Sequence, residues 1–254
     1  MFAVKSGGHN ANPGANSIND GVSIDLHYMN STYLSPDRSF VILGSGLTWG
    51  GAYNVFEKQN IGFTGGICPD VGVGGLAVGG GQSLYQASKG WVVDNILDYE
   101  LVLASGEVVH ANETARPDLF KALKGGSTNL GIVTGIKLEA FELGQIWGGQ
   151  LLVNLKGPAS NRDDMIKNLT KNFVDFVGNN KDDVDSGVQI VTSYLSGGAV
   201  QIVDLELTNT ANIEKPAAVN AFLGMPNQIE DTTRHTSLAD ISRETGEAVP
   251  KGYR

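Results

Sequence analysis

One stretch of twenty residues, Gly62 to Gly81, constrains the fold of this chain more than any other. It reads GFTGGICPDVGVGGLAVGGG and contains nine glycines and the only cysteine of the chain, Cys68. Glycine weakens helices and strands, because it has no side chain to pack and loses the most conformational freedom on folding. Such a density of glycine indicates sharp turns, or a backbone that must lie close against another group.

By spacing alone, Gly72 to Ala77 matches the dinucleotide-binding fingerprint G-x-G-x-x-[GA]. That fingerprint needs a strand before it and a helix that opens within it. Pro69 and Asp70 interrupt the strand, and we expect that the following VGGG cannot start the required helix. We therefore interpret the match as chance, which disfavours a Rossmann-type nicotinamide enzyme.

The thiol of Cys68 has two interpretations. It could be a nucleophile paired with a distant histidine, or a buried structural cysteine. Activated thiols usually lie at a helix N-terminus or beside a cation, whereas Cys68 precedes a proline among glycines. Residue types alone therefore favour the structural interpretation.

A second glycine-bearing loop follows the first predicted strand and reads KSGGHN, Lys5 to Asn10. Without side chains at Gly7 and Gly8, several consecutive backbone N–H groups can turn toward one anion, as in a pyrophosphate-binding nest. Taken alone, a tight turn with a solvent-facing His9 explains the loop better. Paired with the first glycine-rich stretch, the loop favours anion binding, because both present bare backbone beside a nucleophilic side chain.

Composition excludes several other classes. The chain has 254 residues, a net charge of −9 and a pI near 4.9, so its acidic surface disfavours nucleic acid as a partner. Its apolar runs fall short of the roughly 18 residues of a membrane span, which disfavours a membrane partner. One cysteine excludes a disulfide framework and a cysteine-built zinc site, and four scattered histidines show no metal-ligand spacing (His9, His27, His110, His235).

The pattern predicts an α+β fold with two domains, 1–142 and 143–254. The first begins with short strands; we then expect a helix that Thr48 caps, with Val55 and Phe56 on its buried side. After it we expect a hairpin that turns at Ser105-Gly106, then a helix that begins at Pro117 and ends at Gly125, and then a long strand over 127–141. The second has strands over 146–155, 186–195 and 199–208, and a helix whose apolar stripe is Met165, Leu169, Phe173, Phe176 and Val177.

Five segments occur together in the order and approximate spacing of a known family: KSGGHN, GGICPDVGVGGLAVGGG, GWVVDN, ASGEVV and GGSTNLGIVTGIKL. Residues 1–142 resemble the FAD-binding domain of the vanillyl-alcohol-oxidase (PCMH-type) superfamily, and most of all the fungal berberine-bridge-enzyme-like oxidoreductases. Residues 143–254 resemble the first part of the family's substrate domain, an antiparallel sheet with helices. The resemblance implies a chain truncated at both ends.

The resemblance also assigns cofactor-binding residues. His9 matches the histidine that bonds the 8α methyl of FAD, and Cys68 matches the cysteine that in some members bonds C6 of the ring. The pyrophosphate loop corresponds to Ser6, Gly7, Gly8 and Asn10. The backbone that lines the ring and the ribityl chain corresponds to Val73, Gly74, Gly75, Gly79 and Gly80. A further backbone segment that contacts the cofactor corresponds to Asn129, Gly131, Ile132 and Val133.

The implied function is an FAD-linked oxidoreductase that oxidises a sugar or a secondary-metabolite alcohol or amine by hydride transfer to flavin N5, with O₂ as the acceptor. The alternative is a truncated fragment without turnover. The resemblance names no catalytic base in this chain: Leu76 stands where some relatives carry a histidine, and Tyr194 is better explained as a buried strand residue than as a substrate contact. Relatives are commonly secreted, although this chain shows no signal peptide.

Overall fold

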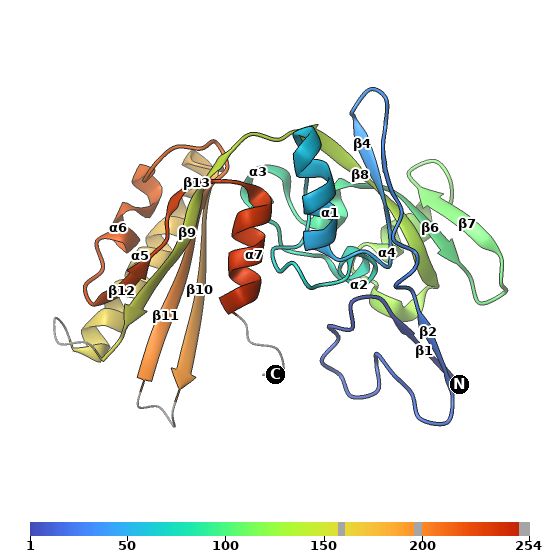
Figure 1. Cartoon of the computed structure of the whole chain (residues 1–254), viewed down its shortest axis with the longest axis horizontal. Helices are drawn as coiled ribbons and strands as arrows, with labels where there is room; N and C mark the ends of the chain where they lie inside the picture. Colours follow the sequence, from blue (N-terminus) through green and yellow to red (C-terminus); the bar gives the residue numbers. More distant parts are fainter. Residues whose placement is uncertain (157–160, 196–199, 249–254) are drawn as a thin grey trace. The chain divides into compact units, whose positions relative to one another are not determined.

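The computed structural model describes residues 1–156, 161–195 and 200–248. The chain divides into two compact units: unit 1 is Met1–Leu143 with Gly246–Arg254, and unit 2 is Gly144–Thr245 (Figure 1). The predicted second domain also includes residues 157–160, 196–199 and 249–254, which lie outside the described residues. Helices and antiparallel sheets occur in both units, so the predicted α+β class is confirmed.

Over Met1–Leu143, unit 1 contains eight strands and four α-helices, connected by turns and short 3₁₀ segments. Its strands are β1 (Phe2–Lys5), β2 (Val22–Asp25), β3 (Thr32–Leu34), β4 (Phe40–Gly44), β5 (Ile61–Phe63), β6 (Ile96–Val102), β7 (Val108–Asn112) and β8 (Ile132–Glu142). Its helices are α1 (Trp49–Phe56), α2 (Val73–Gly79), α3 (Gln86–Lys89) and α4 (Pro117–Leu123), and its 3₁₀ segments are η1 (Glu57–Gln59), η2 (Val92–Asn95) and η3 (Ser127–Asn129).

A six-stranded antiparallel sheet organises unit 1, in the order β3-β4-β8-β6-β7 with β5 also paired to β8. Strands β1 and β2 form a separate parallel pair. Side chains alternate along the large sheet: Tyr99 and Leu101 are fully buried, whereas the intervening Glu100 lies on the opposite face. The Tyr99 hydroxyl donates to the carbonyl of Ala77 over 2.8 Å, so the buried face is the one that carries α2.

Several local predictions for unit 1 are confirmed. The Thr48 side chain caps α1 by accepting a hydrogen bond from the Gly51 N–H, β6 and β7 form the hairpin, and Gly125 closes α4 with φ +96°. The predicted burial of Val55 is wrong: it is 38% exposed, and the inner face of α1 is formed by Trp49, Ala52, Tyr53 and Phe56.

The glycine-rich stretch contains a helix that was not predicted, α2 (Val73–Gly79); the VGGG segment lies at its C-terminal end and does not start it. Burial of Val73, Ala77 and Val78 stabilises this helix against the low propensity of its glycines. The surrounding sheet is antiparallel rather than the parallel sheet of a Rossmann domain, so the spacing match still does not indicate that fold.

Unit 2 is built on a five-stranded antiparallel sheet in the order β10-β11-β9-β12, with β13 also paired to β9. Its strands are β9 (Ile146–Asn154), β10 (Ser186–Leu195), β11 (Val200–Asn209), β12 (Gln228–Asp231) and β13 (Arg234–Thr236). Its helices are α5 (Arg162–Asn179), α6 (Asn220–Leu223) and the part of α7 (Leu238–Ala248) up to Thr245, with 3₁₀ segments η4 (Asn180–Asp182) and η6 (Ala217–Val219).

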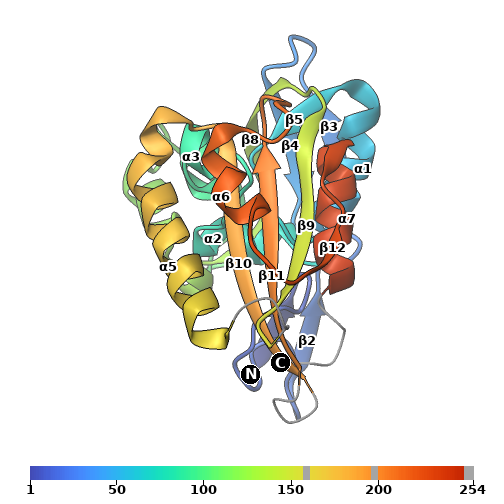
Figure 2. The ribbon, with the colours of Figure 1, turned by 90° about the vertical axis from the view of Figure 1, so that its left-hand side faces the viewer.

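Helices α5 and α6 pack on one face of this sheet, where Met165 and Phe222 join a core with Val203, Leu205 and Leu207 (Figure 2). The stripe predicted for α5 is confirmed at Met165, Leu169 and Phe176, but Phe173 and Val177 are exposed. Tyr194 is 57% exposed, so its predicted burial is wrong.

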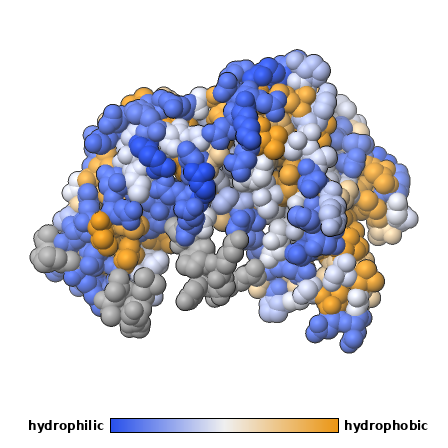
Figure 3. Space-filling view, viewed as in Figure 1, coloured by the Kyte–Doolittle hydropathy of each residue, from blue (hydrophilic) through white to orange (hydrophobic). Residues whose placement is uncertain are grey.

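The surface shown in Figure 3 is largely hydrophilic, and hydrophobic residues on it are scattered, as on most folded proteins. Among the helices of the described residues, none is both long and apolar enough to cross a membrane.

Candidate functional site

The KSGGHN loop is held in a fixed shape by hydrogen bonds to residues outside it. Ser6 Oγ donates to the carbonyl of Ser45 over 2.6 Å, and Asn16 Nδ2 donates to the carbonyls of Gly8 (3.0 Å) and Asn10 (2.7 Å). Gly8 has φ +73°, the left-handed region that favours glycine, and turns the chain immediately before His9. His9 and Asn10 are exposed, so the imidazole that the resemblance assigns to flavin attachment is accessible.

The two glycine-rich segments lie in direct backbone contact. A Cβ atom on Gly7 would lie 2.3 Å from the backbone nitrogen of Gly72, and one on Gly72 would lie 2.2 Å from the nitrogen of Gly7. Real Cβ atoms do not approach backbone that closely, so both positions must lack a side chain. The structure therefore places the predicted pyrophosphate loop against the start of α2.

The exposed face of α2 is bare backbone. Gly75 and Gly79 lie four residues apart on one side of the helix, both are exposed, and a Cβ at either would meet nothing within 4 Å. The inner glycine differs, because a Cβ on Gly74 would lie 2.8 Å from Cβ of Ser45. Gly80, beyond the helix, has φ +117°. This glycine strip fits a flat ring laid close against the backbone.

Two buried tyrosines donate hydrogen bonds to backbone carbonyls of the glycine-rich segment. Tyr53 Oη donates to the carbonyl of Gly66 over 3.0 Å, as Tyr99 does to Ala77. Burial raises the pKa of Tyr53 well above its usual range, with a smaller contribution from Tyr85, and burial likewise raises the pKa of Tyr99. Both hydroxyls therefore stay protonated at neutral pH and act as hydrogen-bond donors to the backbone, not as acid–base groups.

Cys68 lies at the bend that leads into α2. The residues after it pair with the start of α1: the Gly50 N–H donates to the Pro69 carbonyl (3.0 Å) and the Trp49 N–H to the Val71 carbonyl (3.1 Å). Cys68 is a free thiol and is partly exposed, so the interpretation as a buried structural cysteine is wrong.

The third predicted segment, Asn129 to Val133, packs on α2 through η3 and through β8. Gly131 has φ +151°, and a Cβ there would lie 2.8 Å from the carbonyl oxygen of Val102. Val133 is buried, whereas Asn129 is exposed and donates from Nδ2 to the Gly126 carbonyl. All three predicted segments thus converge on α2.

Two residues that fix the site, Ser45 and Asn16, were not predicted from the sequence. Ser45 accepts from Ser6 through its carbonyl and packs on Gly74, and Asn16 closes the His9 loop. No local signal identifies Asn16, which lies in a turn-rich stretch of polar residues, and Ser45 acts through its backbone and Cβ. Among the described residues, no cluster of His, Cys, Asp or Glu could hold a metal ion.

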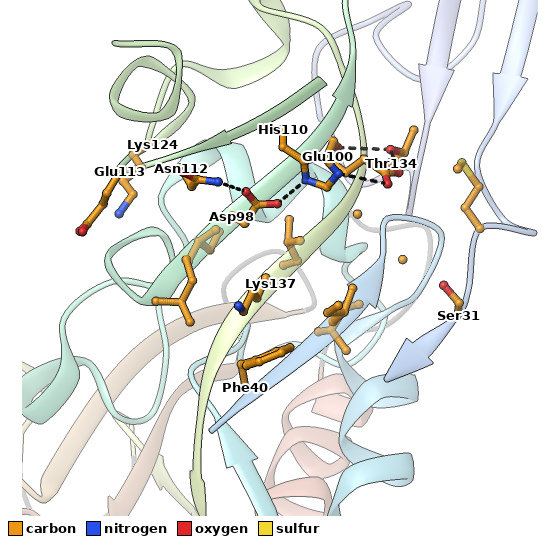
Figure 4. A pocket seen from close by; sticks show the side chains of 18 of the residues that line it. Ser31, Phe40, Asp98, Glu100, His110, Asn112, Glu113, Lys124, Thr134 and Lys137 are labelled. Carbon is orange, nitrogen blue, oxygen red and sulfur yellow. Dashed lines mark hydrogen bonds and ion pairs between the residues drawn. The ribbon is translucent and has the colours of Figure 1, made fainter. Parts of the chain in front are cut away.

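A separate hollow of about 710 Å³ opens on the face of the unit 1 sheet opposite α2, and no predicted cofactor residue lines it (Figure 4). In it, the Asp98 carboxylate lies 2.6 Å from His110 Nδ1 and accepts from Asn112 Nδ2 over 2.6 Å. Lys137 lies over the Phe40 ring, 3.7 Å from its centre. This hollow is charged and open, unlike the glycine strip of α2.

Proteins similar to this chain include several FAD-dependent enzymes. The FAD binding domain family matches residues 1–112. The FAD-dependent monooxygenase tpcD of Cochliobolus heterostrophus is 33% identical over 100% of this chain and 48% of its own length; the FAD-dependent monooxygenase sdcF of Emericella nidulans is 36% identical over 100% of this chain and 51% of its own. The chain thus spans about half the length of these curated relatives.

Solved structures agree in fold. Xylooligosaccharide oxidase from Myceliophthora thermophila C1 matches with a TM-score of 0.76 at 26% identity, over 96% of this chain and 50% of that one. The BBE-like 1 protein of Physcomitrella patens matches with a TM-score of 0.74 at 26% identity, over 90% and 48%. The chain therefore belongs to the vanillyl-alcohol-oxidase (PCMH-type) superfamily of FAD-binding oxidoreductases, in its berberine-bridge-enzyme-like group.

Proposed function

We propose that this chain forms the flavin-binding part, and a portion of the substrate-binding part, of an enzyme that oxidises a small molecule with O₂ as the electron acceptor. The proposed substrate class is a sugar or a secondary-metabolite alcohol or amine. The observation that carries the proposal is the glycine strip of α2, with the His9 loop in backbone contact with its first turn. When bound, FAD would supply the two-electron acceptor for hydride removal from a substrate carbon.

The residues of this chain bind and orient the cofactor. Backbone N–H groups around Gly7 and Gly8 would hold the pyrophosphate, as in other anion-binding nests. The strip at Gly75 and Gly79 would lie along the ring, because these positions leave space for it. Val133 and Gly131 position the start of β8 beside α2. We assign no general base to this chain, and Leu76 provides no charge beside the ring.

We further propose that FAD is attached covalently through His9 and Cys68, in keeping with the accessibility of both side chains. Each bond would join a flavin carbon to the His9 nitrogen or the Cys68 sulfur with loss of one hydrogen from each partner, and dioxygen would take up these two electrons and two protons as hydrogen peroxide. Two attachment points would fix the ring while one face stays open to a bulky substrate.

Acid denaturation of the chain tests both proposals. We expect yellow flavin to stay with the precipitated polypeptide, with the intact mass raised by one FAD. His9→Ala and Cys68→Ala should each keep the flavin through the remaining bond, and the double variant should release it. Release of intact FAD from the unmodified chain would leave flavin binding standing but overturn covalent attachment. A colourless chain at apoprotein mass would overturn the proposed function.

The reaction with O₂ can be tested without knowing the substrate. Several curated relatives are named monooxygenases, and an oxidase and a monooxygenase differ in where the oxygen goes. We expect the photoreduced holoprotein to reoxidise rapidly in air and to release one hydrogen peroxide per flavin. Slow reoxidation, as in a dehydrogenase, would contradict the oxidase proposal while leaving flavin binding intact.

A further inference from the structure

Strand β10 forms one edge of the unit 2 sheet. It pairs with β11 in continuous register from Ser186↔Asn209 to Leu195↔Val200, and among the described residues no strand pairs with its other side. On that side, alternate backbone N–H and C=O groups point away from the sheet. Such an edge is a template on which another strand can add.

β10 lacks the features with which proteins protect a sheet edge. The other strands at the ends of the two antiparallel sheets are short: β3 has three residues, β12 four and β7 five, and β12 also carries Glu230 and Asp231. β10 has ten residues, SGVQIVTSYL, with no proline and no charged side chain, and its pairing with β11 has no bulge. Short length, charge, proline and bulges are the usual protection of an edge, so β10 is typical of a strand that a partner covers.

Hydrophobic side chains are exposed along β10 on both faces of the sheet. Val188 and Ile190 pack against the core of unit 2, so alternation places Tyr194 on the same face and Val191 on the opposite face. Tyr194 is 57% exposed and Val191 is 43% exposed. A strand added at this edge would cover both side chains.

Helix α5 continues this apolar surface beside the strand. It lies over the β10 side of the sheet (Figure 2), and on one flank Asn172 Nδ2 donates to the carbonyl of Ala221 in α6 over 3.1 Å. Helical geometry places Phe173 and Val177 on the flank turned away from α6, where both are exposed. The apolar stripe of α5 is therefore wider than the core of unit 2 requires.

The sequence of β10 is complementary to a second copy of itself. A two-fold axis perpendicular to the sheet runs two β10 strands antiparallel and keeps both α5 helices on one face. With this axis at Val191, no charged residues oppose each other, and the opposed pairs are Val191–Val191, Gln189–Ser193, Ile190–Thr192 and Val188–Tyr194. An aromatic ring opposite a β-branched residue is a favourable cross-strand pair.

A shift of the axis by one residue removes this complementarity. With the axis at Ile190, Val191 would lie opposite the polar Gln189, and Tyr194 would lie opposite Ser186. The register with Val191 on the axis is therefore the better matched of the two central registers.

We propose that β10 and the outer flank of α5 form the interface of a symmetric homodimer, in which the unit 2 sheets of two copies join into one continuous antiparallel sheet. Main-chain hydrogen bonds between the two β10 strands supply affinity, and the opposed side chains fix the register. Phe173 and Val177 of each copy extend the contact beside the strands. The interface lies within unit 2 and does not depend on flavin binding.

Sedimentation equilibrium on the full chain tests the dimer. We expect a mass of twice 26.8 kDa at micromolar concentration. Val191→Lys places two like charges directly opposite each other and should weaken the dimer by about tenfold or more. Val191→Glu should do the same, whereas an equal mixture of the two variants should associate again, because opposite charges then face each other across the axis. That recovery would show that neither variant lost the dimer by unfolding.

Val108→Lys is the matched control, because Val108 is 61% exposed on the short edge strand β7 of unit 1, and its replacement should leave the dimer unchanged. A wild-type chain that keeps the mass of one copy throughout the micromolar range would overturn the proposal. So would a dimer that Val191→Lys leaves intact.

Cysteine cross-linking tests the register in a Cys68→Ala background. Opposed Cα atoms of an antiparallel pair lie about 4.5–5.5 Å apart, which a disulfide can span. Val191→Cys should therefore form a disulfide-linked dimer on oxidation, whereas Ser193→Cys, which lies opposite Gln189, should not. Cross-linking of Ser193→Cys in place of Val191→Cys would overturn the assigned register.

Discussion

Gly75→Ala separates what α2 needs for stability from what it needs for cofactor binding. Gly75 is the third residue of the helix, and a Cβ there would meet nothing within 4 Å. Replacing a helical glycine with alanine stabilises a helix by about 0.5–1 kcal/mol, because glycine has more freedom to lose. In a chain of this size that gain corresponds to roughly 1–4 °C in melting temperature of the apoprotein.

The effect on flavin should have the opposite sign. If a ring lies against this face, the added methyl occupies its position, and such overpacking costs about 1–3 kcal/mol. Because about 1.4 kcal/mol is tenfold in affinity, we expect the dissociation constant for FAD to rise by roughly tenfold or more. The measurement is a titration followed by FAD fluorescence in the His9→Ala, Cys68→Ala background, where noncovalent affinity alone is observed.

Two glycine variants serve as controls. Gly178→Ala lies near the end of α5 in unit 2, also in open space, and should raise stability without changing FAD affinity. Gly74→Ala should destabilise unit 1, because its Cβ would lie 2.8 Å from Cβ of Ser45. If Gly75→Ala binds FAD as well as Gly178→Ala does, the bare face of α2 is not the flavin surface and the site assignment fails.

Three further predictions concern interactions inside unit 1 or inside unit 2. Gly7→Ala should destabilise unit 1 by about 1–3 kcal/mol and abolish FAD binding, because its Cβ would collide with Gly72. Chemical denaturation and FAD titration check these two effects. Unchanged stability would contradict the backbone contact between Gly7 and Gly72. Thr48→Ala should cost about 1 kcal/mol by removing the α1 cap, measured by urea denaturation, with Thr48→Ser retaining most of the stability. Folding raises the pKa of Glu206 from 4.5 to about 7, so the stabilisation from its protonated form is full below about pH 4.5 and is lost as pH rises through about 7, a change of up to about 3 kcal/mol. Glu206→Gln should therefore flatten the dependence of the unfolding free energy on pH between these values. An unchanged profile would contradict the raised pKa of Glu206.

Local chemistry makes much of the fold predictable, and long-range packing makes the rest unpredictable. The Thr48 cap, the hairpin at Ser105-Gly106 and the close of α4 at Gly125 each follow from a few neighbouring residues, and all three are confirmed. The helix through the glycines could not be predicted because its stability comes from distant partners, such as the Tyr99 hydroxyl on the Ala77 carbonyl. The exposure of Tyr194 could not be predicted because strand periodicity does not identify which strand lies at the edge of a sheet.

The same limit applies to the candidate site. The two glycine-rich segments can be recognised separately, and each alone is better explained as a turn or as chance. What joins them is the contact between Gly7 and Gly72, which are sixty-five positions apart and have no side chain to leave a pattern in the sequence. Asn16, which fixes the His9 loop, has no distinguishing neighbours at all.

The glycines of α2 differ in whether the fold itself accounts for them. Gly74 is needed for the close approach of Ser45, and Gly72, just before the helix, is needed for the approach of Gly7. A Cβ on Gly75 or Gly79 would meet nothing within 4 Å, neither residue has a positive φ, and each costs up to about 1 kcal/mol relative to alanine. A chain selected only to fold would gain stability by replacing them. Their presence on the one exposed face, beside the accessible His9 loop, is therefore explained by a partner that must lie against bare backbone, and a flat flavin ring is such a partner.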